Sequence, residues 1–367
     1  MTQDNRLDAR AAPGLLVHTK PGAGARRLCL ALATLICAPP MAARAQTSDV
    51  EKFYAGRNVE FLVGSAPGGG YAIYANLLSR HLGRHIPGAP HVIARTVEGA
   101  GSLTAANQIY TTAPRDGSVF GAVFTGAIVE PLIGDRAKAR YDSRKFSFVG
   151  SANRETSVCF ARKDADVKSW ADVFAKKVIV AGAGWASSIR QFPAVLNKVL
   201  GTKFEIVTGY PGSKEAVGAV EKGEAQGVCG IQWSSFGPQY GSWIDKGDVV
   251  VFGQIAAPPG DPLQNSRGVQ NIWDVVTDAG NRRVLEVIFN QSEYGRPYIA
   301  PPGVPPERLN ALRRAFDATM KDPEFLADAA RGGLPINPMT GEEFQAAVDK
   351  VYEVPETDVA RAKEALE

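Results

Sequence analysis

The feature that most constrains the fold is a repeated order of apolar strand, glycine-rich turn and amphipathic helix. It first occurs in residues 59–71 (VEFLVGSAPGGGY), where an apolar run enters three consecutive glycines and a helical segment follows. The same order recurs over residues 177–200 and 204–222. Alternating short apolar runs and amphipathic segments are typical of α/β proteins with largely parallel sheets. Ligands of open α/β sheets bind beyond the carboxyl ends of the strands, where these turns are expected.

Hydrophobic periodicity predicts the order of the elements along the chain. Strands are expected at residues 59–66, 91–97, 118–126, 146–152, 157–162, 177–184, 204–210, 225–231, 248–256 and from 298. Helices are expected at residues 71–85, 103–111, 189–200, 213–222, near 269–290, from 306 and within 341–365. About 320 residues of such a pattern exceed what one hydrophobic core usually organises, so two α/β units are expected.

Residues 1–45 have the pattern of an export signal. Arg26 and Arg27 precede a short apolar run at residues 28–38, and Ala43-Arg44-Ala45 follows it. A basic segment, an apolar run and an A-x-A site predict cleavage after Ala45. The apolar run is too short to span a bilayer.

The charge of the chain depends on this leader. Residues 1–45 hold six of the 41 basic residues and two of the 38 acidic ones, so the charges of the remaining chain nearly cancel. The sequence pI of about 8.6 therefore largely reflects the leader. We expect no basic surface that would attract nucleic acid or anionic lipid.

Two cysteines, Cys159 and Cys229, remain after the leader, each in an apolar run with the pattern of a strand. An oxidising compartment would allow a disulfide between them. A buried thiol also serves as a small hydrophobic side chain, and two free buried thiols are the favoured expectation.

The first glycine-rich turn resembles a phosphate loop but lacks its charged residue. Gly64 and Gly69 have the phosphate-loop spacing, yet Gly70 and Tyr71 stand where Lys and Ser or Thr are required. Free backbone N–H groups at a helix start favour an anion. Without the lysine, a carboxylate fits this turn better than a triphosphate. The alternative is that the glycines only permit a tight turn.

The second and third turns allow similar alternatives. Ser187 and Ser188 precede a helix, where either is a candidate N-cap or a donor to an anion. Trp185 either forms a wall of a cleft or is a core residue. Arg190 either pairs with a second carboxylate of the ligand or is solvated. The third turn, residues 209–214, again joins a strand to a helix.

Catalytic and metal motifs are missing from the sequence. His81 and His85 are four residues apart, but Leu82 follows His81 where a metalloprotease helix has glutamate. The pair is therefore expected on an exposed helix face. Neither G-x-S-x-G nor G-x-G-x-x-G after a strand occurs. We expect no enzyme, no metal and no cofactor, with a hydrolytic enzyme as a weaker alternative.

Three segments carry a resemblance to a known family. Residues 56–70 (GRNVEFLVGSAPGGG), 97–121 (VEGAGSLTAANQIYTTAPRDGSVFG) and the export signal together resemble the Bug family. These are periplasmic solute-binding receptors of tripartite tricarboxylate transporters. The resemblance covers nearly all of the chain after the leader.

The resemblance implies a two-lobed α/β fold of the flytrap type, each lobe a mostly parallel sheet flanked by helices. The expected lobes are residues 46–152, 153–292, and a return to the first lobe at 293–367. It implies that turns of both lobes hold a carboxylate through backbone N–H groups, hydroxyls and water. The expected ligand contacts are Ser65, Ala66, Pro67, Gly68, Gly69, Gly70, Tyr71, Ala72, Thr125, Gly126, Ser187, Ser188, Gly212 and Ser213, to which the turn analysis adds Trp185 and Arg190.

The resemblance also implies a periplasmic, monomeric receptor that delivers a small organic acid to inner-membrane transporter subunits, with no nucleic-acid partner. A ligand sensor of the same fold, docking on a signalling partner, is the alternative.

Two departures from the family pattern stand out. Ala186 replaces a usual glycine, and Tyr71 stands where many relatives have a small polar residue. Tyr71 and Trp185 together predict a pocket with more aromatic surface than a citrate-like ligand needs.

Overall fold

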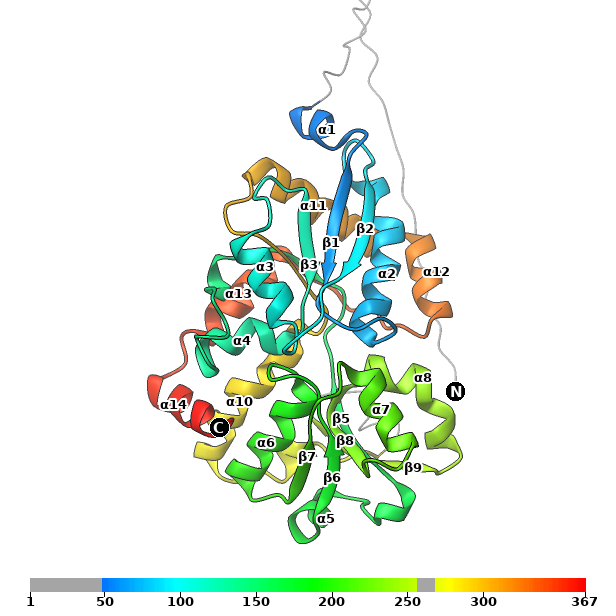
Figure 1. Cartoon of the computed structure of the whole chain (residues 1–367), viewed down its shortest axis with the longest axis vertical. Helices are drawn as coiled ribbons and strands as arrows, with labels where there is room; N and C mark the ends of the chain where they lie inside the picture. The colour runs from blue at the N-terminus through cyan, green and yellow to red at the C-terminus, as the bar shows by residue number, and fades with distance from the viewer. Residues whose placement is uncertain (1–47, 256–267) are drawn as a thin grey trace, which may run out of the picture. The chain divides into compact units, whose positions relative to one another are not determined.

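Two mixed β-sheets, each flanked by helices, organise the chain (Figure 1). The computed structural model describes residues 48–255 and 268–367, and all of them belong to one compact unit, Thr47–Glu367. We call the first sheet with its helices the first lobe, and the second sheet with its helices the second lobe. The leader predicted for residues 1–45 lies outside the described residues.

The first sheet has the strand order β11-β4-β10-β3-β1-β2. Its strands are β1 (Asn58–Val63), β2 (His91–Thr96), β3 (Val119–Ala122), β4 (Ser147–Ser151), β10 (Pro297–Ala300) and β11 (Met339–Thr340). Strand β1 is parallel to β2 and β3, whereas β10 is antiparallel to β3 and β4. The parallel part of the sheet is therefore the part that ends in the first glycine-rich turn.

The second sheet has the order β7-β6-β8-β5-β9. Its strands are β5 (Ser157–Arg162), β6 (Val178–Ala181), β7 (Phe204–Val207), β8 (Gly227–Gln232) and β9 (Val249–Ile255). Strand β6 is parallel to β7 and β8, and β5 is antiparallel to β8 and β9. The expected two-lobed α/β fold is confirmed, with antiparallel strands where the chain passes between the sheets.

The helices follow the expected order with several additions. Those with the first sheet are α1 (Asp49–Tyr54), α2 (Gly70–Leu82), α3 (Leu103–Thr111), α4 (Thr125–Ile133), α11 (Pro306–Thr319), α12 (Pro323–Arg331) and α13 (Gly341–Val351). Those with the second are α5 (Trp170–Ala175), α6 (Ser188–Leu200), α7 (Ser213–Glu221) and α8 (Trp233–Asp245), and α10 (Ala279–Phe289) packs on α6 and α14 (Glu356–Glu364). None of the helices in these described ranges has the length and apolarity that a bilayer span requires.

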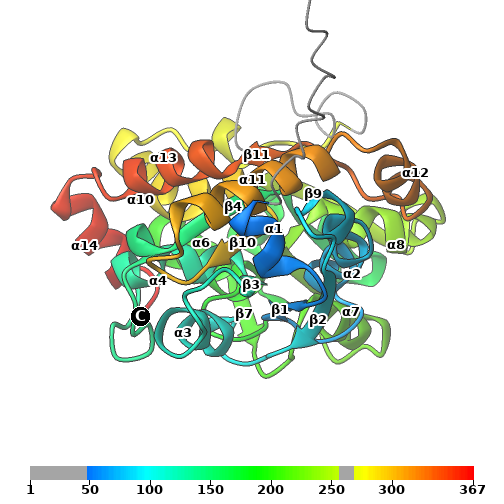
Figure 2. The same ribbon diagram turned by 90° about the horizontal axis from the view of Figure 1, so that it is seen from above.

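Strands β1, β3, β4 and β10 of the first sheet are buried on both faces, whereas edge strand β2 is partly exposed. Consecutive strand residues point to opposite sides of the sheet. Phe61 and Phe120 stack with ring centroids 4.2 Å apart in the cluster that contains residues of α2 and α11. Leu62 and Phe148 belong to the opposite cluster, which includes Phe344 of α13. Figure 2 shows α11 and α13 beside β4. This double burial explains why the strands read as continuous apolar runs.

Helices α4 and α8, whose first residues lie at the ends of strands β3 and β8, were not predicted. The expected strand 118–126 ends at Ala122, and Thr125 begins α4. Nearly every residue of α4 is buried, so it shows no polar face, and it contains Pro131. Helix α8 contains Pro238 and has non-helical backbone at Tyr240. Sequence rules disfavour helices with an internal proline, so both elements were missed.

Two further helical predictions were too long. The segment near residues 269–290 becomes a short 3₁₀ turn, Ile272–Asp274, and then α10, which begins only at Ala279. The helical segment within 341–365 is two helices, α13 and α14, separated at Pro355. Proline lacks the N–H that a continuing helix needs, which accounts for the second break.

The cysteines form a disulfide, so the expectation of two free thiols was wrong. Strands β5 and β8 are antiparallel neighbours, and Cys159 pairs directly with Cys229 across them. Their Cα atoms are 3.9 Å apart. The sequence showed that both cysteines lie on strands but carried no signal that the two strands are neighbours in this register.

The two histidines of α2 also differ from expectation. His81 is only 7% exposed, and its Nε2 lies 2.8 Å from Asp328 Oδ2 of α12. His85 Nε2 lies 2.7 Å from Asp322 Oδ2. The expected exposed face is therefore covered by α12, a helix that the sequence analysis did not include. Within residues 48–255 and 268–367, no group of three His, Cys, Asp or Glu side chains is arranged to hold a metal ion.

Replacing both cysteines by alanine should lower the free energy of unfolding by about 2–4 kcal/mol, because the bond closes a loop of 70 residues. Urea denaturation of residues 46–367 measures this change. Alkylation of the unreduced, denatured protein should modify no cysteine, and reduction should expose two. Two modified cysteines without reduction would contradict the disulfide.

Candidate functional site

A cavity lies between the two lobes. Its lining residues follow the carboxyl ends of β1, β3, β6, β7 and β8. They are Ser65, Ala66, Gly69, Gly70, Tyr71, Phe124, Thr125, Ser187, Ser188, Ile189, Gly212, Ser213, Ile231, Gln232 and Ser235. None of these described residues carries a formal charge. The cavity occupies the position at which ligands bind in open α/β folds.

Five helices begin at this cavity: α2, α4, α6, α7 and α8. Their N-cap residues are Gly69, Phe124, Ser187, Gly212 and Gln232, and none of these side chains accepts a capping hydrogen bond. By contrast, α1, α5, α10, α12 and α13 begin elsewhere and have side-chain caps. Helices α3, α11 and α14 are also uncapped, the last two after proline. The first turns at the cavity thus leave backbone donors without side-chain partners.

Several of these donors are unused. Among the hydrogen bonds of the described residues, none involves the backbone N–H of Gly70, Tyr71, Ser188, Ile189 or Ser213. Helix α8 is different, because Trp233 N donates to Thr156 O and Ser234 N to Glu155 Oε2. Free donors and the positive ends of three helix dipoles, those of α2, α6 and α7, therefore face the cavity.

One serine of the wall is unpartnered as well. Ser65 is 3% exposed, and its Oγ has no hydrogen-bond partner in the described structure. A buried hydroxyl without a partner loses free energy relative to its hydrated state. Ser65 directly follows the β1 turn residue Gly64 and lines the cavity. An acceptor placed in the cavity would satisfy it.

Ser102 holds two of the cavity loops together. It is fully buried, its Oγ donates to Gly64 O at 2.6 Å, and it accepts from Phe124 N at 2.9 Å. It therefore fixes the end of β1 against the start of α4. Ser102 belongs to the segment of residues 97–121 that carries the family resemblance, although its bridging role was not predicted.

Backbones of the two lobes touch beside the cavity. A Cβ added to Gly184 would lie 2.3 Å from Gly101 N, and one added to Gly126 would lie 2.0 Å from Ala186 O. The loop of residues 182–186 in the second lobe therefore approaches two glycine positions of the first. Gly101 and Gly126 have no side chain, which leaves room for the backbone of Ala186. Position 186 is the one at which the family pattern has glycine.

Tyr71 bridges the lobes inside the cavity. Its Oη accepts a hydrogen bond from Thr125 N at 3.2 Å and another from Gln232 Nε2 at 3.0 Å. Its ring lies 4.6 Å from that of Phe124 and 4.6 Å from the Arg296 guanidinium. Burial raises the pKa of the Tyr71 phenol above its ordinary value, and Arg296 and the two donors oppose that rise. The phenol is therefore neutral at physiological pH.

A buried ion pair lies behind this wall. Arg296 and Glu155 are on the segments that connect the two sheets, and Arg296 Nε donates to Glu155 Oε1 at 3.0 Å. Arg296 is 1% exposed, and its Nη2 donates to Ser235 Oγ at 2.8 Å and also to Ser234. The guanidinium thus contacts the cavity wall through Ser235 and Tyr71 without lining the cavity itself.

A chain of buried amides extends from the cavity between the lobes. Thr125 Oγ1 donates to Gln291 Oε1 at 2.9 Å, and Gln291 Nε2 donates to Gln191 Oε1 at 3.3 Å. Gln191 Nε2 then donates to Glu130 Oε2 at 3.3 Å. Burial raises the pKa of Glu130, and Lys138 and Arg190 are among the groups that lower it again. The chain joins α4 of the first lobe to α6 of the second.

The structure brings ten of the predicted site residues together at the cavity: Ser65, Ala66, Gly69, Gly70, Tyr71, Thr125, Ser187, Ser188, Gly212 and Ser213. Pro67, Gly68, Ala72 and Gly126 adjoin them in sequence but do not line it. Ser187 occupies the N-cap position, as predicted, without a capping bond, and Ser188 Oγ donates to Gly230 O at 2.7 Å.

Trp185 and Arg190 lie outside the cavity lining. The Arg190 guanidinium stacks 3.7 Å above the Trp185 ring, and Lys138 Nζ lies 4.1 Å from the same ring. Arg190 therefore lies against an aromatic side chain and near Glu130, away from the cavity wall. The expectation that Trp185 forms a wall of the cavity does not fit this position.

Sequence reasoning missed five lining residues: Phe124, Ile189, Ile231, Gln232 and Ser235. Gln232 ends β8, one residue beyond the predicted strand, so the rule that ligands bind at strand ends could have indicated it. Ser235 lies in the unpredicted helix α8, and Arg296 behind it gave no sequence signal because its partner Glu155 is 141 residues away.

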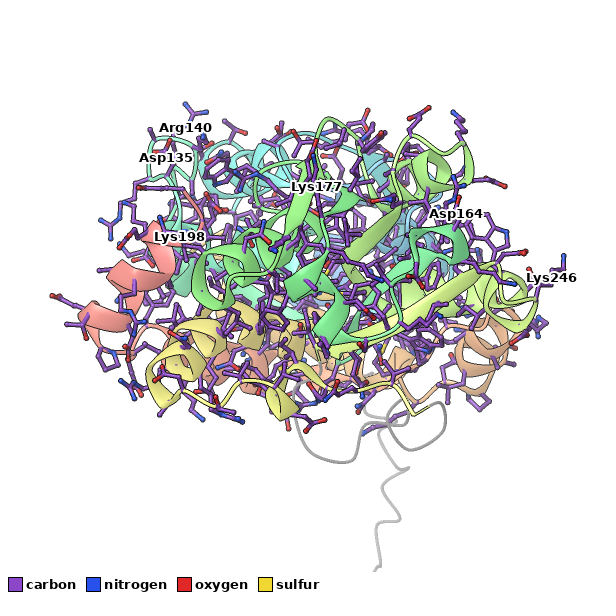
Figure 3. The ribbon with its side chains drawn as sticks, turned by 90° about the horizontal axis from the view of Figure 1, so that it is seen from below. Asp135, Arg140, Asp164, Lys177, Lys198 and Lys246 are labelled. Carbon is purple, nitrogen blue, oxygen red and sulfur yellow. A yellow bond between two sulfur atoms is a disulfide. The ribbon has the colours of Figure 1, made fainter. Side chains whose placement is uncertain are left out.

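Charges on the outer surface are mixed in sign. Figure 3 labels Asp135, Arg140, Asp164, Lys177, Lys198 and Lys246; Asp135 and Arg140 lie near each other, and Asp164, Lys177 and Lys246 lie away from them. Lys177 is paired with Glu205, and Lys198 Nζ lies 3.6 Å from Glu364 Oε1. Charged side chains thus lie outside the cavity, and its own wall depends on backbone and hydroxyl groups.

Several solved structures share this fold. The periplasmic binding protein BugD is 19% identical, with a TM-score of 0.67 over 85% of this chain and 98% of BugD. MatC from Rhodopseudomonas palustris, solved with bound malate, is 18% identical, with a TM-score of 0.64 over 85% of this chain and 99% of MatC. Rpa4515 of R. palustris, solved with adipate, is 15% identical, with a TM-score of 0.64 over 84% of this chain and 96% of that protein.

These neighbours are of the type that the sequence resembles, and the expected fold is thereby confirmed. No protein-family profile and no curated protein sequence matches the chain.

Gly184→Ala should lower the free energy of unfolding by about 1–3 kcal/mol, because the new methyl group meets backbone atoms of Ala100 and Gly101. Gly218→Ala is the matched control in α7, where a Cβ meets nothing within 4 Å, and should raise stability by about 0.5–1 kcal/mol. Urea denaturation measures both. Equal stability of G184A and the wild type would show that the loops do not touch.

Glu130 should make stability depend on pH. Its pKa is higher in the folded protein than the ordinary 4.5, so the folded state holds the proton more tightly. The stability that Glu130 adds by binding this proton is fully present below pH 4.5. It is lost as the pH rises through the raised pKa of Glu130 in the folded state. Denaturation curves of Glu130→Gln at several pH values should lack this loss, whereas Glu353→Gln, at an exposed position, should follow the wild type. A wild-type slope that persists in E130Q would assign the effect elsewhere.

Proposed function

We propose that this protein is a periplasmic solute-binding receptor that captures a small organic acid in the cavity between its lobes. The observation that carries the proposal is that uncapped helices begin at a cavity whose described wall has no charged side chain. The proposed contacts are the ten predicted residues that line the cavity, together with Gln232 and Ser235. The acid passes from the receptor to transporter subunits in the inner membrane.

An anion is the ligand that such a wall favours. A carboxylate leaving water needs several donors to replace its hydration, since an unpaired buried charge is very costly. The free N–H groups of Gly70, Ser188 and Ser213 belong to three different helices, and each hydrogen bond to a charged acceptor contributes about 1.5–3 kcal/mol. A cation would meet the positive ends of these helices and find no carboxylate on the described wall.

The apolar residues of the cavity wall favour an acid with a carbon chain. Phe124, Ile189 and Ile231 give the wall an apolar part beside the donors. Malate in MatC and adipate in Rpa4515 are small organic acids found in proteins of the same fold.

The proposed function involves no chemical step. No nucleophile paired with a general base lines the described cavity, and structural neighbours are solute-binding proteins. The leader pattern of residues 1–45 and the disulfide between Cys159 and Cys229 support an exported location, because disulfides persist in oxidising compartments.

A titration of residues 46–367 with malate and with adipate tests the proposal. Ser65→Ala should weaken binding by about three- to tenfold, since it removes one donor. It should leave the unliganded protein as stable as the wild type, because Ser65 Oγ has no partner to lose. Calorimetry and thermal unfolding measure the two effects separately, and an acid at 100 times its Kd should add about 2.7 kcal/mol of stability.

Ser79→Ala is the matched control, because Ser79 lies in α2, the helix that follows Ser65, and bonds only to Asn76 O outside the cavity. It should leave acid binding unchanged. Equal binding by S65A and the wild type would contradict the placement of the acid, and a wild-type protein that binds neither acid would contradict the proposed ligand class.

A further inference from the structure

We propose that Lys214 supplies the positive charge that pairs with a second carboxylate of the bound acid, so that the site prefers diacids to monoacids. This inference rests on the proposed function and adds a preference within the class of acids. A phosphate loop has lysine at the position of Gly70, and the first turn therefore lacks a cation of its own. The structure brings a lysine to that turn from the second lobe.

Lys214 lies against the first turn across the boundary between the lobes. A Cβ added to Gly68 would lie 3.1 Å from Lys214 Nζ and 3.2 Å from its Cδ. Gly68 has a φ of +82°, a conformation that favours glycine, and its missing side chain leaves the room that the lysine occupies. Because Lys214 is the second residue of α7, its ammonium reaches the first lobe from a helix of the second.

This contact lies at the edge of the cavity. Gly69 and Ser213 both line the cavity, and a Cβ added to Gly69 would lie 3.8 Å from Ser213 Oγ. Gly68 and Lys214 adjoin these two residues in sequence, and neither of them lines the cavity. Lys214 is exposed. We therefore call the edge formed by Gly68 and Lys214 the mouth of the cavity, and the ammonium lies there.

The ammonium has no counter-charge among residues 48–255 and 268–367, where no ion pair or hydrogen bond involves the Lys214 side chain. Glu215, the next residue, does not neutralise it. Glu215 Oε2 has no hydrogen-bond partner and lies toward Gly212, 3.3 Å from the position of a Cβ there. An ammonium has three donors, and its flexible stem lets it turn toward a carboxylate at the mouth.

A diacid can use the N–H groups and the lysine together. One carboxylate accepts from the hydroxyl of Ser65 and the free N–H of Gly70, and the other end of the acid extends toward Ser213. There the second carboxylate meets the start of α7 and the ammonium of Lys214, which favour a negative charge. A monoacid has no second charge to pair with the ammonium. Lys214 thus adds to the backbone donors and does not replace them.

Adipate and hexanoate measure this preference, because they have the same carbon chain and only adipate has a second carboxylate. In calorimetric titrations of residues 46–367 at neutral pH, adipate should bind more tightly. Lys214→Met keeps the length of the side chain and removes its charge. It should weaken adipate by about two- to fivefold at low salt and leave hexanoate unchanged. Lys214→Arg keeps the charge and should retain the preference for adipate.

The salt dependence of binding gives a second readout. Raising the salt concentration from about 0.01 M to about 1 M shortens the Debye length from about 30 Å to about 3 Å, so a charge at the mouth is screened. The affinity of the wild type for adipate should fall more steeply over this range than that of K214M. The same slope for both proteins would contradict a pairing role of the ammonium.

Lys222→Met is the matched control. Lys222 is exposed at the other end of α7, so its replacement removes the same charge away from the mouth. It should leave the affinities for both acids unchanged. Equal weakening of adipate and hexanoate by K214M, or no weakening of either, would overturn the inference and leave the proposed function standing. A wild-type protein that binds neither adipate nor malate would overturn both.

Discussion

The structure depends on unsatisfied backbone N–H groups at the starts of several helices that face one cavity. A helix start left without a cap costs stability, and five other helices of this chain avoid that cost with serine, aspartate or threonine caps. Gly69, Phe124 and Gly212 at the cavity offer no such acceptor. The donors are thus arranged for an acceptor from outside the chain. Both sheets contribute, because the carboxyl ends of parallel strands in each lobe lead into these helices.

The two lobes meet through groups that tolerate close approach. Glycine backbones at 101, 126 and 184 allow the loops to touch, and buried amides link Thr125 to Glu130 beside them. The connecting segments carry Glu155 and Arg296, whose ion pair is almost completely buried. A buried pair is costly unless its groups are bonded. Ser234 and Ser235 supply acceptors for Nη2 of Arg296, and Nη1 has no hydrogen-bond partner in the described structure. This network places a cation behind a cavity wall that has no charge of its own.

Much of this arrangement could be predicted from the sequence, because the strands and glycine-rich turns follow simple local rules. The turn before α2 and the turns before α6 and α7 lie at the cavity. Helices α4 and α8 could not be predicted in this way, since one is buried on all sides and the other contains proline. The contacts of Gln232, Ser235 and Arg296 depend on which distant strands are neighbours. The pairing of Cys159 with Cys229 could not be predicted for the same reason, because the sequence carries no local signal for the register between strands whose cysteines are 70 residues apart.

A crystal structure of residues 46–367 grown with adipate tests the central claim most directly. The account predicts a carboxylate within hydrogen-bonding distance of Gly70 N and Ser65 Oγ, with Tyr71 Oη still bonded to Thr125 N and Gln232. The other end of the acid should contact donors of the second lobe, at Ser188 or Ser213. Adipate bound outside the cavity, or held there through charged side chains in place of these N–H groups, would contradict it.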